Sequence, residues 1–269
     1  MKRSPLGVFD SGVGGLTVVK AIQALLPCED VVYLGDTARL PYGSKSPDTI
    51  RQFSDEDVRF LVSKGVKAIV VACNTATAHA LPSLQAEYEV PIIGVVVPGV
   101  DAALADPDAD RFGIIATRGT IDSHVYQHAL ATRRTGVIIH GVPTPLLVPL
   151  IEENWLEEDV TKDILKKYLQ PLIERNIDTL LLGCTHYPLL VPALRELLPD
   201  HVRLVDSATT CAERLKEMLS ELDLLCEEGK EDGSLQIFLT DLSEQFEELA
   251  KRFLNKDIGR IRRGNLVSR

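Results

Sequence analysis

The feature that most constrains the fold is an alternation, along the whole chain, of short apolar runs rich in β-branched residues with stretches of helical periodicity. Each run has the length of a buried strand, and polar or glycine-containing segments separate the runs. Strands that alternate with helices are typical of a mainly parallel sheet covered by helices, which is the α/β class. The expected strands lie at 7–9, 31–34, 68–72, 92–96, 112–116, 136–140, 179–183, 202–205 and 235–239.

Helix signals lie between these runs. Pro47 and Asp48 begin a segment whose apolar residues recur on one face, and Ser243 precedes a similar segment that ends near Leu254. The acidic segments 105–110 and 227–233 are expected to form exposed turns rather than linkers. Any division into domains must therefore follow a cleft rather than a flexible spacer.

The charge balance argues against some classes of partner. The 269 residues carry a formal net charge of -10 at pH 7, and nucleic-acid phosphates require a basic surface. The run 68–72 is among the longest apolar runs and is far shorter than the roughly 20 residues of a membrane-spanning helix. Because the start, MKRSPLGVFD, has no apolar signal core, we expect a cytoplasmic protein with no membrane partner. The basic residues of 256–269 are interpreted as a solvated tail rather than a binding patch.

The five cysteines indicate reduced thiols, because an odd number cannot pair completely and the cytosol keeps thiols reduced. The sequence has no CxxC spacing, so we expect no metal site. Cys28, Cys211 and Cys226 lack a polar setting and are expected to be structural.

A similarity between two segments of the chain distinguishes the other two cysteines. The segment AIVVACNTATAHALPSL at 68–84 resembles TLLLGCTHYPLLVPAL at 179–194. In each, a strand leads to a cysteine and then to a helix, so Cys73 and Cys184 fall where ligand sites of open α/β sheets gather. The helix N-terminus favours a thiolate, which can act as a base. Duplication would give two similar halves with matched thiols, and a chance match of two short segments is the alternative.

Two N-terminal segments supply further candidates. GVFDSGVGGLTV at 7–18 places Asp10 and Ser11 before a glycine-rich turn that can bind an anion, although its spacing fits neither a dinucleotide fingerprint nor a phosphate loop. Asp10 can cap this turn or assist a thiol, and taken alone the cap is the preferred interpretation. GDTARLPYGSKS at 35–46 places Asp36 after a strand and before a loop that either closes over a substrate or forms a structural turn.

Two candidates in the second half of the chain differ in setting. His186 follows Cys184 and Thr185 directly and can orient or titrate the neighbouring thiol. Glu152, by its spacing alone, is a solvated charge on a helix.

Together these segments resemble the glutamate racemase family, a branch of the aspartate/glutamate racemase superfamily. The resemblance covers nearly the whole chain. It implies two similar α/β domains that face each other across an active-site cleft, one formed by residues 1–97 and 207–269 and the other by residues 98–206. It is carried, in order, by GVFDSGVGGLTV, GDTARLPYGSKS, VVACNTATA, GVVVPG at 94–99, LVPLIEEN at 147–154, GCTHYPLL at 183–190 and VDSA at 205–208.

The resemblance also implies roles. Cys73 and Cys184 would be the two acid/bases, with Asp10 beside the first and His186 beside the second, and the auxiliary acids would be Asp36 and Glu152. The implied substrate-binding set is Asp10, Ser11, Pro41, Tyr42, Gly43, Ser44, Cys73, Asn74, Thr75, Thr117, Thr120, Cys184, Thr185 and His186.

The expected reaction is the interconversion of L- and D-glutamate. Inversion at Cα requires a proton to leave one face and another to arrive at the opposite face, which two opposed thiols can perform. We expect neither a metal nor pyridoxal, and the resemblance implies a supply of D-glutamate for peptidoglycan. A homodimer is expected because symmetric dimers are the commonest oligomers.

Three alternatives stay open on the sequence alone. The substrate of the same superfamily could be aspartate or a hydantoin. A protein with this cleft could instead be a non-catalytic small-ligand receptor or act through its surface. A redox or zinc protein is the third class.

Overall fold

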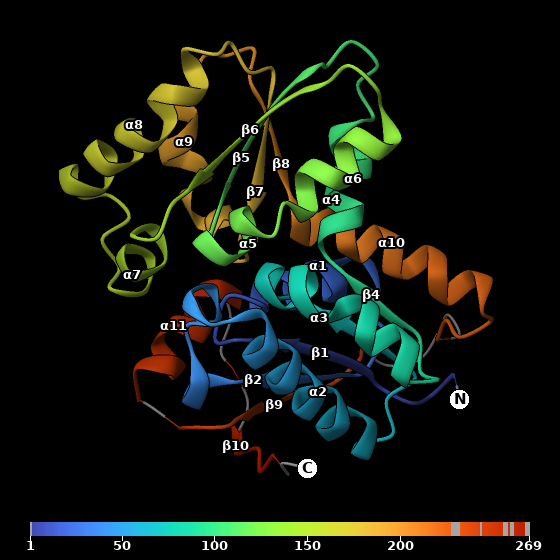
Figure 1. Ribbon diagram of the computed structural model, residues 1–269. Helices are drawn as coiled ribbons and strands as arrows, with labels where there is room; N and C mark the ends of the chain where they lie inside the picture. Colours follow the sequence, from blue (N-terminus) through green and yellow to red (C-terminus); the bar gives the residue numbers. More distant parts are fainter. Residues whose placement is uncertain (1, 227–231, 243, 255–257, 259–260, 267–269) are drawn as a thin grey trace.

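Two parallel β-sheets, one above the other in Figure 1, form the framework of the protein in a computed structural model. The structure describes all residues except 1, 227–231, 243, 255–257, 259–260 and 267–269. The first sheet has the strand order β10-β9-β2-β1-β3-β4 and the second has the order β6-β5-β7-β8. Helices cover both sheets, so the α/β class predicted from the sequence is confirmed.

Burial explains why the strands are apolar throughout. Every residue of the central strand β1 is buried, as expected for a parallel strand covered on both faces. The first sheet consists of β1 (Leu6–Asp10), β2 (Val31–Gly35), β3 (Ala68–Val71), β4 (Ile92–Gly94), β9 (Leu235–Leu239) and β10 (Arg262–Arg263). The second sheet consists of β5 (Arg111–Ala116), β6 (Ile138–Pro143), β7 (Thr179–Gly183) and β8 (Arg203–Asp206).

Several helices begin at side chains that cap them. The Ser46 hydroxyl accepts the Thr49 N–H, and Pro47 occupies the first turn, which fixes the start of α2. Asp206 caps α10 by accepting two backbone N–H groups. The helices are α1 (Leu16–Leu25), α2 (Pro47–Ser63), α3 (Asn74–Glu87), α4 (Val96–Ala103), α5 (Arg118–Asp122), α6 (Val125–Arg133), α7 (Leu147–Glu152), α8 (Asp159–Ile173), α9 (Val191–Leu197), α10 (Ser207–Glu221) and α11 (Glu244–Leu254), with short 3-10 turns η1 (Thr37–Arg39), η2 (Tyr42–Ser44) and η3 (Tyr187–Leu190).

The two sheets repeat one topology. In β2-β1-β3-β4 and in β6-β5-β7-β8 alike, the second strand along the chain lies at one side, followed by the first, third and fourth. Cys73 follows the third strand of the first series, and Cys184 follows the third strand of the second. The sequence similarity between 68–84 and 179–194 therefore corresponds to a repeated strand order, which favours duplication over a chance match.

Each sheet with the helices that cover it forms one unit of the fold. The two units share one hydrophobic core on the side of α1 and α10. Helix α10 packs against both α1 and α4, and α11 packs against α1. The largest core cluster contains Val8 from the first sheet, Leu182 from the second and Leu215 from α10. The domain boundaries expected above stay a prediction.

Two strand predictions are wrong in their limits by two residues or more. The apolar run 92–96 contains only the short strand β4, because Val96 already belongs to α4, and a buried helix turn is as apolar as a strand. The run 136–140 begins too early, because Gly136 has a φ of 80° and belongs to the turn before β6. Pro143 ends β6, as an edge strand allows.

The C-terminal basic segment is in part a strand. Arg262 and Arg263 are exposed and pair with β9 as β10, whereas Lys256, Arg260 and Arg269 lie outside the described residues. The expected turn at 227–233 and Ser243 also lie largely or wholly outside them. Within the part of the chain that the structure describes, no helix is both long and apolar enough to cross a bilayer.

Candidate active site

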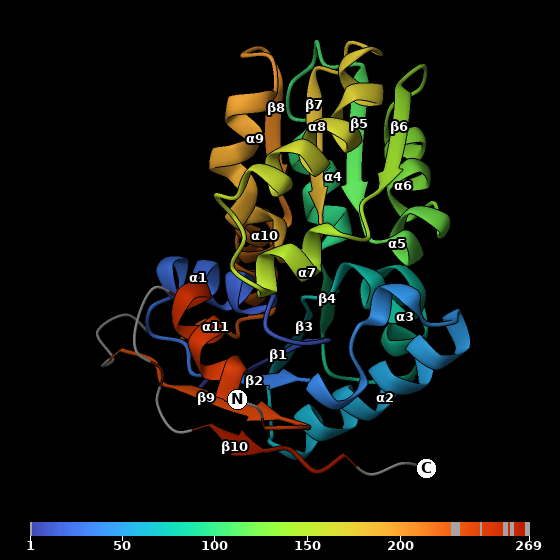
Figure 2. The same ribbon diagram turned by 90° about the vertical axis from the view of Figure 1, so that its left-hand side faces the viewer.

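A cavity of about 400 Å³ lies between the two units, at the carboxyl ends of the strands. Figure 2 shows α5 and α7 at the lower edge of the second unit, facing the first. This volume lies within the range of small-molecule sites, roughly 300–1,000 Å³. The lining residues are Ser11, Gly12, Leu40, Pro41, Tyr42, Gly43, Ser44, Cys73, Asn74, Thr75, Thr117, Arg118, Thr144, Pro145, Val148, Pro149, Glu152, Glu153, Gly183, Cys184, Thr185 and His186.

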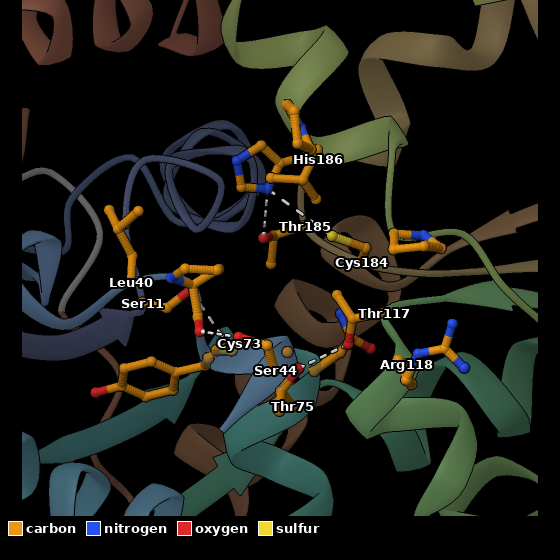
Figure 3. Close-up of a pocket in the computed structure, with 18 of the residues that line it drawn as sticks. Ser11, Leu40, Ser44, Cys73, Thr75, Thr117, Arg118, Cys184, Thr185 and His186 are labelled. Atoms are coloured by element: carbon orange, nitrogen blue, oxygen red, sulfur yellow. Dashed lines mark hydrogen bonds between the residues drawn. The ribbon is translucent and has the colours of Figure 1, made fainter. Parts of the chain in front are cut away.

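The cavity brings together most of the side chains singled out in the sequence, and Figure 3 shows both cysteines, Ser11 and Thr117 around it. Asp10, Asp36 and Thr120 do not line it and lie behind its wall. Thr120 reaches the wall through hydrogen bonds to Thr75 and Thr117. The functional roles of all these residues stay predictions.

Cys73 is the N-cap residue of α3. Its sulfur accepts the Ala76 N–H at 3.5 Å and lies 3.9 Å from the Ser11 hydroxyl. Burial, with a further contribution from the Asp10 carboxylate, nevertheless raises the pKa of the Cys73 thiol to about 12. Desolvation therefore opposes the thiolate that the helix N-terminus favours, and the role of Cys73 as a thiolate base stays a prediction.

Cys184 lies at the start of a chain of polar groups that ends at Glu152. The Cys184 sulfur is 3.8 Å from Nδ1 of His186, and Nε2 of His186 is 3.0 Å from the Glu152 carboxylate. Burial opposes the charged form of His186, but its hydrogen bonds to Cys184 and Glu152 raise the pKa of the imidazole to about 10. A protonated His186 can thus donate to the sulfur and to the carboxylate at once. Glu152, which its spacing placed on a solvated helix face, lines the cavity.

Asp10 stabilises the glycine-rich turn. This turn lies against the segments that carry Cys73 and Cys184, which are called the first and the second thiol loop below. Asp10 is buried, and its carboxylate accepts the Gly12 N–H at 3.0 Å, so the turn-capping interpretation is confirmed. Burial raises the pKa of Asp10, while the charge of His186 and the turn N–H groups lower it. The Thr185 hydroxyl lies 3.5 Å from the other carboxylate oxygen, which links the turn to the Cys184 loop.

The turn approaches the Cys184 loop so closely that position 14 has room only for glycine. A Cβ at Gly14 would lie 2.3 Å from Nδ1 of His186 and 2.3 Å from the Thr185 hydroxyl. The Thr17 hydroxyl donates to the Thr185 carbonyl at 3.0 Å in the same region. The glycine-rich turn therefore provides space for the second thiol loop.

Asp36 belongs to a cluster behind the 40–44 loop. Its carboxylate accepts hydrogen bonds from Arg39, from the Tyr42 hydroxyl at 2.5 Å and from the Thr240 hydroxyl at 2.9 Å. Arg39 also pairs with Glu56 and Asp57 on α2. Asp36 therefore contacts the cavity wall through Tyr42 and touches neither thiol among these contacts.

Sequence reasoning missed the apolar wall opposite the first unit. Pro145, Val148 and Pro149 lie in or next to α7, and Thr144 follows β6. Thr144 occupies the position in the second sheet that Asp36 occupies in the first, so the repeat could have indicated it. Apolar residues carry no comparable signal, because they are equally expected in a core.

The Asp/Glu/Hydantoin racemase family model matches residues 15–215. A glutamate racemase from Aquifex aeolicus is 44% identical over 94% of this chain and 95% of its own length.

This chain belongs to the glutamate racemase family. The resemblance inferred from the sequence is thereby confirmed, and the protein is an isomerase of the racemase class.

Solved structures of this family match the whole fold. A glutamate racemase isoform from Bacillus anthracis superposes with a TM-score of 0.93 at 37% identity, covering 99% of this chain and 98% of that one. A glutamate racemase from Francisella tularensis, solved in complex with D-glutamate, superposes with a TM-score of 0.91 at 34% identity, covering 100% and 98%.

Proposed function

We propose that this racemase interconverts L- and D-glutamate by a two-base mechanism in which Cys73 and Cys184 are the opposed acid/bases. The observation that carries the proposal is that topologically equivalent thiols of two repeated sheets line one small cavity. One thiolate removes the Cα proton, and the thiol on the opposite face supplies a new one. Reversing the two protonation states reverses the reaction.

The environments of the thiols differ in a way that suits this scheme. The pKa of Cys73, raised to about 12, favours a protonated thiol, which is the form that donates. At Cys184, the protonated His186 can stabilise negative charge on the sulfur while Glu152 balances the imidazolium. The enantiomer whose Cα–H faces Cys184 would then react in this protonation state.

A weakly acidic Cα–H requires stabilisation of the carbanion. Polar groups around the cavity offer hydrogen bonds to the substrate carboxylates without bulk positive charge, which suits an acidic protein that binds an acidic amino acid. The proposed donors for this stabilisation are Ser11, Thr75, Thr117 and Thr185, and Asn74 is proposed to hold a carboxylate equally in the substrate and in the carbanion. The apolar side chains of Val148 and Pro149 would exclude water.

The proposal requires neither a metal nor pyridoxal. Among the described residues, no group of three or more His, Cys, Asp and Glu side chains is arranged to hold a metal ion. Family membership supports D-glutamate as a product for peptidoglycan, and we place the enzyme in the cytoplasm. A homodimer is also proposed, supported by exposed apolar side chains at Leu146, Trp155 and Val160, and sedimentation would test it.

The test is incubation of the dialysed protein in D₂O with L-glutamate and, separately, with L-aspartate. We expect loss of both optical rotation and the Cα–H proton signal with glutamate alone. Exchange with aspartate alone would change the substrate and keep the mechanism. Exchange with neither amino acid would refute the proposal and favour a receptor.

A further inference from the structure

Asn74 follows the thiol Cys73 directly and lines the cavity, but its side chain is only half satisfied. Its residue surface is 3% exposed, and its amide nitrogen Nδ2 is buried with no hydrogen-bond partner within the described part of the chain. A buried donor left unpaired costs roughly 1–3 kcal/mol. Such a donor at the wall of a small-molecule cavity indicates an acceptor on the ligand.

The other half of the amide is held from the opposite unit. The hydroxyl of Tyr126, on α6, donates to Oδ1 of Asn74 at 2.6 Å. This contact engages the oxygen end of the amide, which accepts the tyrosine proton. The Nδ2 donor is therefore the free end.

The ring of Tyr126 lies close to the second thiol loop. Tyr126 is 1% exposed, and a Cβ added to Gly183, the residue before Cys184, would lie 3.1 Å from Cε2 of its ring. Burial, followed by the nearby charge of Cys184, raises the pKa of Tyr126, so its hydroxyl keeps the proton that it donates. One side chain thus lies beside the residue before one thiol and hydrogen-bonds to the residue after the other.

We propose that Tyr126 is a positioning residue that orients the Asn74 amide, so that Nδ2 donates to a carboxylate of the bound amino acid. The proposal rests on the proposed function for its ligand. Tyr126 itself touches no substrate and acts through Asn74. Because Asn74 would hold a carboxylate rather than the migrating proton, Tyr126 affects both directions of the reaction alike.

The test compares Tyr126→Phe with a matched control, Tyr88→Phe. Tyr88 also donates its hydroxyl to a neighbouring carboxylate, that of Asp55, and it does not line the cavity. In Tyr126→Phe we expect KM to rise about tenfold for both L- and D-glutamate, with a much smaller change in kcat, since a freely rotating amide weakens ground-state and transition-state binding alike. Tenfold corresponds to about 1.4 kcal/mol. Tyr88→Phe should keep the wild-type KM.

A double-mutant cycle separates positioning from a purely structural role. If Tyr126 acts through Asn74, adding Tyr126→Phe to Asn74→Ala should change KM no further. Additive effects or an unchanged KM in Tyr126→Phe would each overturn the proposal. Failure of the proposed function is distinguishable, because the wild-type protein and Tyr88→Phe would then also show no Cα–H exchange with glutamate.

Discussion

Gly14→Ala offers a sharp test of how the two thiol loops are held together. The added Cβ would lie 2.3 Å from both Nδ1 of His186 and the Thr185 hydroxyl, whereas an ordinary carbon contact needs about 3.5 Å. Either the turn or the Cys184 loop must therefore move by about 1 Å. A misplacement of this size costs roughly 100-fold in rate, because catalytic groups lose their alignment with the reacting atom.

The assay is the change of optical rotation during racemisation of glutamate, together with thermal unfolding. We expect kcat/KM to fall about 100-fold, and the free energy of unfolding to fall by roughly 1–3 kcal/mol from overpacking. Gly99→Ala is the matched control: a Cβ there meets its nearest atoms at 3.9–4.0 Å, so its activity should match the wild type. Activity of Gly14→Ala within twofold of the wild type would refute the claim that this close approach is required.

Four further outcomes are expected. Cys73→Ala and Cys184→Ala should each abolish racemisation while circular dichroism shows an intact fold, and normal turnover in either variant would contradict the two-base model. Glu152→Gln should lower the pKa of His186, so the basic limb of the kcat/KM profile should move to lower pH. An unchanged limb would show that His186 does not act in its charged form. The pKa of His186 is raised from 6.5 to about 10, so the contribution of its charge to the free energy of unfolding is fully present below pH 6.5. This contribution is lost as the pH rises through about 10. The pH dependence of unfolding should therefore differ between the wild type and Glu152→Gln. Chelators and removal of pyridoxal should leave activity unchanged, and a loss on dialysis that a metal restores would count against this.

The sequence predicted the architecture well because periodicity reports burial directly. A parallel strand such as β1 is buried on both faces and must be apolar throughout. The same logic failed at Val96, where a buried helix turn follows a strand without a polar break. At Val96, the rest of the fold decides between strand and helix, because the apolar residues themselves fit both.

The candidate site was predictable where polar residues follow strands, as at Ser11 and Asn74, because buried polar side chains need hydrogen-bond partners that an apolar core does not supply. The spacing of residues around Glu152 could not predict its place in the site, because only the fold brings α7 close to His186. The ionisation of Cys73 was also beyond the sequence. A local helix terminus can be read from residues, but desolvation depends on everything that packs around the sulfur.

The strand order has a consequence for how the chain is made. The second sheet draws all its strands from one continuous stretch, 111–206, whereas the first sheet includes β9, which comes near the end of the chain. A ribosome releases residues in order, so the second sheet is complete in the nascent chain while β2 still has an open edge where β9 will pair. The unit that starts first is thus the unit that closes last, and α1 acquires its covering helices α10 and α11 only after both sheets have largely formed.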